Sequence, residues 1–167
     1  AIIDISIKPI FYLKGYYTPD DTDSDGIDDY WDIIYTRYCA AEDVNNNSIR
    51  DPGEDINNNS RLDPTYPGTV DIHPDLTPTI TPGTGRIITD QNGFGYFSVT
   101  YPQSEANWTQ VLITAKAKVS GTEETESYIT ILPVLVDELA YDPAREVPPP
   151  GGDTSRYGWS SVCTDAL

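Results

Sequence analysis

The N-terminal segment alternates apolar and polar side chains with a period of two. In residues 1–17, Ile3, Ile5 and Ile7 fall on one side, and polar residues stand between them. Because successive side chains of a β-strand point to opposite faces, this pattern predicts a strand with one apolar face. Pro9 has no N–H to donate, so we expect the strand to lie at a sheet edge, or to bend, at that residue.

A turn signal between two β-prone runs predicts a hairpin in the second half of the chain. Asn92 and Gly93 separate residues 86–90 from residues 95–101, and an Asn-Gly pair is favoured in the tight turns of hairpins. Further along, residues 108–119 carry apolar side chains at alternate positions. We expect this run to form a strand with one buried face.

The last predicted strand is more apolar than the others. Residues 128–136 are apolar on both faces, which is typical of a strand buried inside a sheet or sandwich, and Gly121 predicts the turn before them. The strand spacing favours an all-β fold, a β-sandwich, over residues 1–141. Residues 142–167 are rich in Pro and Gly, and we expect a tail that lies along the domain surface or reaches a neighbouring molecule.

A long polar insert interrupts this predicted sandwich. Residues 18–67 are rich in Asp, Asn, Pro and Tyr and have little apolar periodicity. Within them, residues 30–38 are compatible with a strand or a short helix. Trp31, Ile34 and Tyr38 share one helical face, which slightly favours the helix.

The charge of the chain is concentrated in this insert. The chain has 27 acidic and 10 basic residues, a formal charge of −17, and 15 of the acids lie between Asp20 and Asp75 beside three basic residues. Such an acidic excess excludes nucleic acid and anionic membrane surfaces as expected partners. No apolar run approaches about 18 residues, so we expect no membrane insertion by this chain.

The start of the insert has the spacing of a calcium-binding loop. Residues 21–32, DTDSDGIDDYWD, place carboxylates at loop positions 1, 3, 5, 9 and 12, and Gly26 stands at position 6, where the loop turns sharply. Calcium takes about six to eight oxygen ligands, which this spacing curls around one point. The expected ligands are Asp21, Asp23, Asp25, Asp29 and Asp32.

A tandem repeat of period 12 follows in the same insert. DVNNNSIRDPGE (43–54) and DINNNSRLDPTY (55–66) both place Asp or Asn at positions 1, 3, 5 and 9. The expected ligands are Asp43, Asn45, Asn47, Asp51 and Glu54 in the first copy and Asp55, Asn57, Asn59 and Asp63 in the second. We therefore expect two or three calcium ions in all, bound with the modest affinity of extracellular modules, about 10⁻⁴ to 10⁻³ M.

The tandem copies depart from the calcium-loop pattern in two respects. Ser48 and Ser60 replace the glycine of position 6, which strains the turn. Tyr66 occupies position 12 of the second copy, so that copy lacks its last carboxylate. We expect Asp71 or Asp75 to complete it.

These motifs resemble known families. Residues 21–32 resemble thrombospondin type 3 repeats and related bacterial calcium loops, and the tandem pair is similar to Asp/Asn-rich calcium repeats of bacterial surface proteins. Residues 89–123, from TDQNG to SGTE, resemble the second half of bacterial Ig-like domains. The resemblance implies an Ig-like β-sandwich interrupted by a calcium-binding insert, without catalysis, in a surface protein.

The remaining residues favour an exported protein that is not an enzyme. The chain contains no methionine and starts at Ala1, so we expect that a signal peptide has been removed. For Cys39 and Cys163, one disulfide is favoured over two free buried thiols. The one histidine, His73, has no context that suggests a catalytic base, so we expect no catalytic residues. The expected location is extracellular or on the cell surface.

Two functions stay open at this point. Ig-like domains normally carry another strand or two before the segment that resembles residues 1–15, and a sandwich short of a strand exposes a groove. The strand carrying Ile3, Ile5 and Ile7 either fills that groove in another copy, building a head-to-tail, pilus-like fibre, or pairs within its own domain. In the second case the chain is a binding or adhesion module of a larger surface protein or lipoprotein. Glycans are possible additions to either, with Asn107 as the best acceptor.

Overall fold

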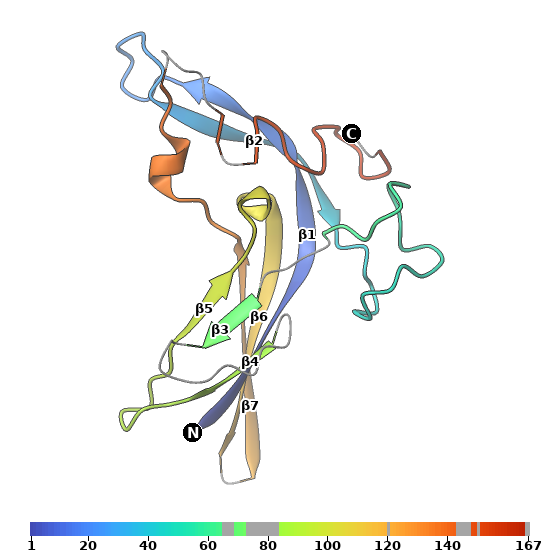
Figure 1. Ribbon diagram of the computed structural model, residues 1–167, viewed down its shortest axis with the longest axis vertical. Coiled ribbons are helices and arrows are strands. Elements are labelled where there is room, and N and C mark those ends of the chain that lie inside the picture. Colours follow the sequence, from blue (N-terminus) through green and yellow to red (C-terminus); the bar gives the residue numbers. More distant parts are fainter. Residues whose placement is uncertain (65–68, 73–83, 120, 143–147, 150, 166–167) are drawn as a thin grey trace.

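The regular secondary structure of the described chain consists almost entirely of antiparallel β-strands (Figure 1). A computed structural model describes residues 1–64, 69–72, 84–119, 121–142, 148–149 and 151–165. Its elements are β1 (Ile2–Asp20), β2 (Tyr30–Ala40), β3 (Thr69–Ile72), β4 (Thr84–Ile88), β5 (Phe97–Thr100), β6 (Thr109–Val119), β7 (Thr122–Ile131) and the 3-10 helices η1 (Gln103–Glu105) and η2 (Val136–Leu139). The all-β prediction is confirmed. No helix among these residues is long and apolar enough to cross a membrane.

The long strand β1 organises the larger sheet, whose order is β2-β1-β6-β7. One edge of β1 pairs with β6, and the other pairs with β4 at its beginning and with β2 from Phe11 onward. Pro9 lies between the β4 and β2 pairings, and the register with β6 shifts between Pro9 and Phe11. The prediction for Pro9 is confirmed: among the described residues, an edge without a strand partner and an irregularity coincide at the residue that cannot donate an N–H.

The first half of β1 fills an aliphatic cluster of its own. Ile5 and Ile7 are only 3% and 4% exposed and pack with Ile87 of β4 and Val111 of β6. The partly buried members of this cluster include Ile3, Phe97, Val99, Tyr101, Ile113 and Ala115. The predicted apolar face of the first strand is confirmed, and in this single chain it packs within its own core. Its donation to another copy stays a prediction.

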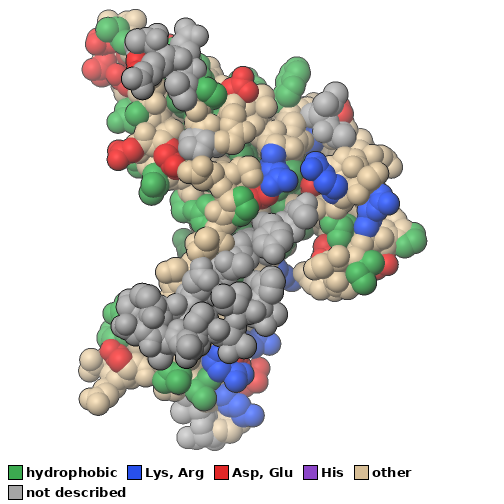
Figure 2. Space-filling view, viewed as in Figure 1, with side chains coloured by type: hydrophobic (Ala, Val, Ile, Leu, Met, Phe, Trp, Pro, Cys, Tyr) green, Lys and Arg blue, Asp and Glu red, His purple; other side chains and the backbone are tan. Residues whose placement is uncertain are grey.

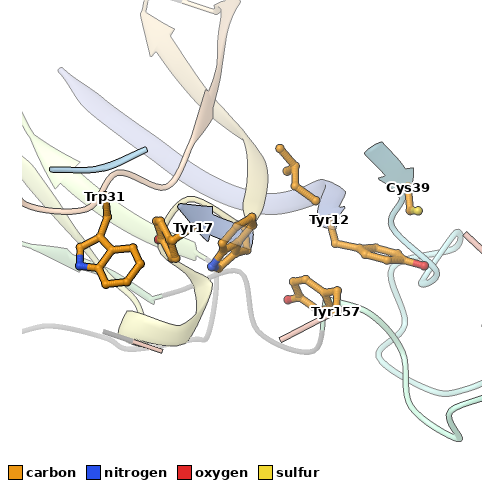
Figure 3. Close-up of a cluster of buried hydrophobic side chains, with 7 residues drawn as sticks. Tyr12, Tyr17, Trp31, Cys39 and Tyr157 are labelled. Atoms are coloured by element: carbon orange, nitrogen blue, oxygen red, sulfur yellow. The ribbon is translucent and has the colours of Figure 1, made fainter. Parts of the chain in front are cut away.

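The second half of β1 contributes to an aromatic cluster (Figure 3). Its buried members are Tyr12, Leu13, Tyr17, Trp31, Cys39, Trp108 and Tyr157. The predicted disulfide between Cys39 and Cys163 is confirmed, with Cα atoms 5.5 Å apart. It ties the end of β2 to the C-terminal segment.

The C-terminal segment lies against β1 at Gly15. The Gly15 N–H donates to the carbonyl of Gly158 at 3.0 Å, and the Ser155 N–H donates to the carbonyl of Gly15 at 3.0 Å. A Cβ at Gly15 would come within 2.0 Å of the Ile34 carbonyl oxygen, so this close approach requires glycine. Residues 151–165 therefore pack against their own domain, and Tyr157 is part of its aromatic cluster.

A buried acid, Glu105, also holds the C-terminal segment in place. Glu105 is fully buried and accepts hydrogen bonds from the Tyr157 and Thr109 hydroxyls and from the Arg156 guanidinium. Buried charges of this kind are tolerated when they are paired and fully hydrogen-bonded. Burial and the Glu105 charge raise the pKa of the Tyr157 phenol well above its ordinary value.

Two local predictions are wrong. Residues 30–38 form part of β2 and not a helix, because Ile33, Ile34 and Tyr35 pair with β1, and such residues fit a pleated sheet. The Asn92-Gly93 turn is present, with Gly93 at a φ of 87°, but β4 pairs with β1 while β5 pairs with β3. The turn therefore passes the chain from one sheet to the other and does not close a hairpin.

The strand predicted to be buried lies instead at the edge of the sheet. β7 pairs with β6, and Tyr128 and Ile129 are 65% and 54% exposed. Within the described residues, Leu132 just beyond the strand is the buried apolar residue of this stretch, at 2% exposed. Apolar residues on both faces were a poor guide here because, among the described strands, β7 is the last of its sheet and pairs with β6 alone, which leaves Tyr128 and Ile129 exposed.

Candidate cation-binding loops

Three loops of the polar insert share one backbone conformation. We call residues 21–32 the first loop, 43–54 the second and 55–66 the third, of which residues 55–64 are described. In each, the N–H at position 6 donates to Oδ2 of the Asp at position 1, at 2.8, 2.9 and 3.0 Å respectively. The N–H at position 5 donates to Oδ1 of position 3, at 3.2, 3.0 and 3.0 Å. The N–H at position 7 donates to Oδ1 of position 5, at 2.8, 2.7 and 2.9 Å.

The backbone angles repeat in the same way. Positions 4 and 6 have positive φ in all three loops. Position 6 is Gly26, at 90°, in the first loop, but Ser48 at 58° and Ser60 at 68° in the others. Non-glycine residues rarely adopt this region, so the predicted strain at the two serines is confirmed. Asp and Asn suit such turns because their short side chains hydrogen-bond to nearby backbone N–H groups.

The first loop brings three carboxylates together at the surface. Ligand oxygens of Asp21, Asp23 and Asp29 lie within 4.8 Å of one another. The N–H groups of the loop, that of Gly26 foremost, lower the pKa of Asp21. The loop joins β1 to β2 at one end of the molecule, where acidic side chains gather in Figure 2.

The two other acids expected in the first loop are used differently. Asp25 accepts the N–H of Ile27 at 2.8 Å. Asp32 is exposed on β2, opposite Thr18, and its carboxylate accepts the N–H of the next residue. The converging group found among the described residues therefore contains positions 1, 3 and 9 but not positions 5 and 12.

The second loop is held together around Asp51. The side-chain amides of Asn45 and Asn47 donate to Asp51 Oδ2 at 2.7 and 2.9 Å. Glu54, only 6% exposed, accepts the N–H groups of Val44 at position 2 and of Asp51 at position 9. All of the ligands expected here, including Asp43 at position 1, are thus gathered in one hydrogen-bonded loop.

The third loop repeats this arrangement with an acid from outside the repeat. Asn57 and Asn59 donate to Asp63 Oδ2 at 2.9 and 2.6 Å. Glu42 accepts the N–H groups of Ile56 at position 2, of Asn57 and of Asp63 at position 9, at 3.1, 3.2 and 3.0 Å. Glu42 therefore bonds to this loop as Glu54 bonds to the second.

The sequence analysis did not identify Glu42 as a candidate residue, although the repeat period of 12 relates it to Glu54. It stands 12 residues before Glu54, directly ahead of the second loop. Asp71 and Asp75, the residues expected to complete the third loop, cannot be compared with Glu42. The side chain of Asp71 and the whole of Asp75 lie outside the described residues, as does Tyr66 at position 12.

The surroundings of the third loop are buried. Glu42 is 0%, Asp63 1% and Asn57 4% exposed. Burial raises the pKa of Glu42. The Tyr12 hydroxyl hydrogen-bonds with Glu42 and Asn57, and burial followed by the charges of Glu42 and Asp63 raises its pKa. The Lys14 ammonium also interacts with Asp63, so this part of the insert is packed against β1.

The remaining candidate residues lie apart from the loops. Asn107 is 7% exposed, and its side-chain nitrogen donates to the Tyr17 hydroxyl at 3.1 Å, so the nitrogen that would carry a glycan faces the core. His73 lies outside the described residues. No family model, curated protein or solved structure matches this chain, so its function has to be argued from its own geometry.

Proposed function

We propose that this chain is a calcium-stabilised structural module of an extracellular or cell-surface protein, and not an enzyme. The observation that carries the proposal is the repeated loop conformation. Three segments with different residues at positions 2 and 8 form the same three hydrogen bonds from backbone N–H groups to Asp or Asn oxygens. In the first loop this brings the oxygens of three carboxylates together, as a calcium ion requires, and we infer the same use for the two loops that share its conformation.

The chemistry of the side chains supports calcium over other metals. The candidate ligands are carboxylate and amide oxygens, which suit hard cations, whereas zinc and copper sites favour His and Cys. Both cysteines are in the disulfide. Two or three bound ions would also offset part of the formal charge of −17, which otherwise makes the folded chain repel itself.

The proposal includes the finer fold. We propose an Ig-like sandwich that carries the three loops as an insert, in which the β3–β5 pair is what remains of the second layer. Its support is that Phe97 and Val99 of β5 pack against the aliphatic cluster between β1 and β6. A sandwich buries one face of each sheet against the other in this way.

Isothermal titration of the chelator-treated full chain with calcium tests the proposal. We expect two or three sites with dissociation constants of about 10⁻³ M or tighter. Magnesium at the same concentration is the matched control and should bind more weakly, because it demands a rigid octahedral shell. No heat and no shift in melting temperature with calcium would overturn the proposal.

Assembly into a fibre is a second candidate, supported by the division of the core. The first half of β1 fills the aliphatic cluster with Ile5 and Ile7, while the aromatic cluster depends on residues from Tyr12 onward. The same half-strand from another copy would fill an identical groove, giving head-to-tail contacts with other copies.

A disulfide lock separates the two arrangements of this strand. Asp4 and Arg86 are paired residues of β1 and β4. If the strand is donated, the Asp4→Cys/Arg86→Cys variant should form fibres when reduced and none when oxidised as a monomer, as seen by negative-stain electron microscopy. Deleting residues 1–9 should abolish fibres as well. Monomers from the unmodified chain in calcium would contradict assembly and leave the binding or adhesion module.

A further inference from the structure

Two buried glutamates, Glu42 and Glu54, link the second and third loops. Glu54 ends the second loop and directly precedes position 1 of the third, whereas Glu42 directly precedes position 1 of the second loop and bonds to the third. Each loop is thus closed by a carboxylate that stands at the entrance of its partner.

We propose that Glu42 is the missing closing acid of the third loop, so that the second and third loops form one two-ion unit with exchanged carboxylates. This inference rests on the proposed calcium binding and assigns the residue that completes the copy ending in Tyr66. Glu42 positions the third-loop ligands through Ile56, Asn57 and Asp63, whose N–H groups it accepts.

Two unpaired oxygens support a cation in the third loop, independently of its hydrogen bonds. Asp55 Oδ1 and Asp63 Oδ1 are buried and have no hydrogen-bond partner among the described residues. In each carboxylate the other oxygen holds the loop: Asp55 Oδ2 accepts the Ser60 N–H, and Asp63 Oδ2 accepts the amides of positions 3 and 5. Leaving a buried carboxylate oxygen unpaired is costly, and a bound cation would remove that cost.

The positive side chains nearby leave these two oxygens unpaired. The Arg50 guanidinium contacts Asp55 through Oδ2 at 2.7 Å, on the side that also holds the loop. The Lys14 ammonium interacts with Asp63 and donates to the carbonyl of Asp165. Oδ1 of position 1 and Oδ1 of position 9 therefore have no hydrogen-bond partner among the described residues and stay available to an ion.

Calcium stoichiometry in matched variants of the full chain tests the proposal. Glu42→Gln should lose the third-loop ion, with an affinity at least about tenfold weaker there, because changes to residues that orient metal ligands cost about 10- to 100-fold. Glu54→Gln should lose the second-loop ion instead. Asp63→Asn should lose the same ion as Glu42→Gln, and combining the two substitutions should remove no further ion.

Terbium luminescence assigns the loss to the third loop. Terbium occupies oxygen-lined calcium sites and is excited by a nearby tyrosine, and Tyr12 hydrogen-bonds to Glu42 and Asn57. Tyr12→Phe and Glu42→Gln should each remove the same part of the tyrosine-sensitised signal and leave the part that Tyr30 sensitises in the first loop, and Glu54→Gln should keep both parts. If Glu42→Gln does not fold, Glu42→Asp keeps the charge on a shorter arm and should weaken the same ion at least about tenfold.

The outcomes separate this inference from the proposed function. If the unmodified chain binds no calcium, the proposed function fails and this inference fails with it. If it binds calcium but folded Glu42→Gln or Glu42→Asp keeps the third-loop ion within about twofold of the original affinity, only the exchanged closure is overturned.

Discussion

The first and third loops have the same backbone conformation in opposite surroundings. The first loop is exposed, and its three converging carboxylates stand at the surface between two paired strands. In the third loop Asn57 and Asp63 are buried, as is Glu42, which bonds to this loop from outside the repeat. The second loop is exposed over residues 44–50 and buries Glu54. The loop with the complete motif is therefore open, and the enclosed loop is the third, which lacks a carboxylate at position 12. How well a loop matches the calcium-loop spacing predicts its local backbone conformation. How far the loop is buried depends on which other parts of the chain pack around it.

The two regions also differ in what holds them without a cation. The ends of the first loop are fixed by the β1–β2 ladder, in which Asp20 pairs with Tyr30. Beyond the end of β2, residues 43–63 contain no strand and are held by the hydrogen bonds of Glu42 and Glu54. Removing cations should therefore affect the tandem pair far more than the first loop.

Calcium removal should have the largest effect. Each filled site contributes about 2.7 kcal/mol when calcium exceeds its dissociation constant 100-fold, so EDTA should lower the melting temperature by roughly 10 °C or more. Hydrogen exchange should show protection lost at the N–H groups of Ile56 and Asp63 but kept in the β1–β2 ladder. Equal loss in both regions would contradict the difference drawn between them.

Removing the disulfide should rank next. Cys39 lies three residues before Glu42, and its bond to Cys163 has a sequence separation of 124 residues. Loops of this order are worth about 4 to 5 kcal/mol in the chain-entropy model. The Cys39→Ser/Cys163→Ser variant should lose that much in urea unfolding and should weaken calcium binding in the tandem pair. An unchanged unfolding midpoint would show that the disulfide does not support this region.

Matched substitutions compare the two regions directly. In calcium, Asp63→Asn should cost about 2 to 4 kcal/mol, because it removes a buried charge that accepts two amide hydrogen bonds and that would bind the proposed ion. Asp23→Asn in the exposed loop should cost less than about 1 kcal/mol. Chemical denaturation of both variants at saturating calcium measures the difference, and equal costs would contradict the role of burial.

Alkaline titration should have the smallest effect and reports on β2, which joins the two regions. Burial, followed by the nearby tyrosines, raises the pKa of Tyr35 to about 12. Because the folded pKa lies above the unfolded value, the stability that depends on neutral Tyr35 is full below about pH 10 and is lost as the pH rises through 12. Absorbance of the phenolate at 295 nm, with Tyr35→Phe as control, follows this step. Ionisation of Tyr35 near pH 10 would contradict its burial.

Much of this protein could be read from local patterns. The period of two predicted β1 and β6, Pro9 marked the irregularity, and the spacing of Asp and Asn predicted three loops that share one conformation. These features follow from the sequence because they depend on neighbouring residues: side-chain direction, the missing N–H of proline and short side chains that bond to their own backbone.

Pairing and enclosure were decided only by the tertiary structure. Residues 30–38 are a strand because β1 lies beside them, and the Asn92-Gly93 turn connects two sheets because each flanking strand finds another partner. Glu42 reaches the third loop although it precedes the second. In each case, groups far apart in sequence compete for the same hydrogen bonds and the same buried space. A local sequence pattern cannot predict which of these groups come into contact.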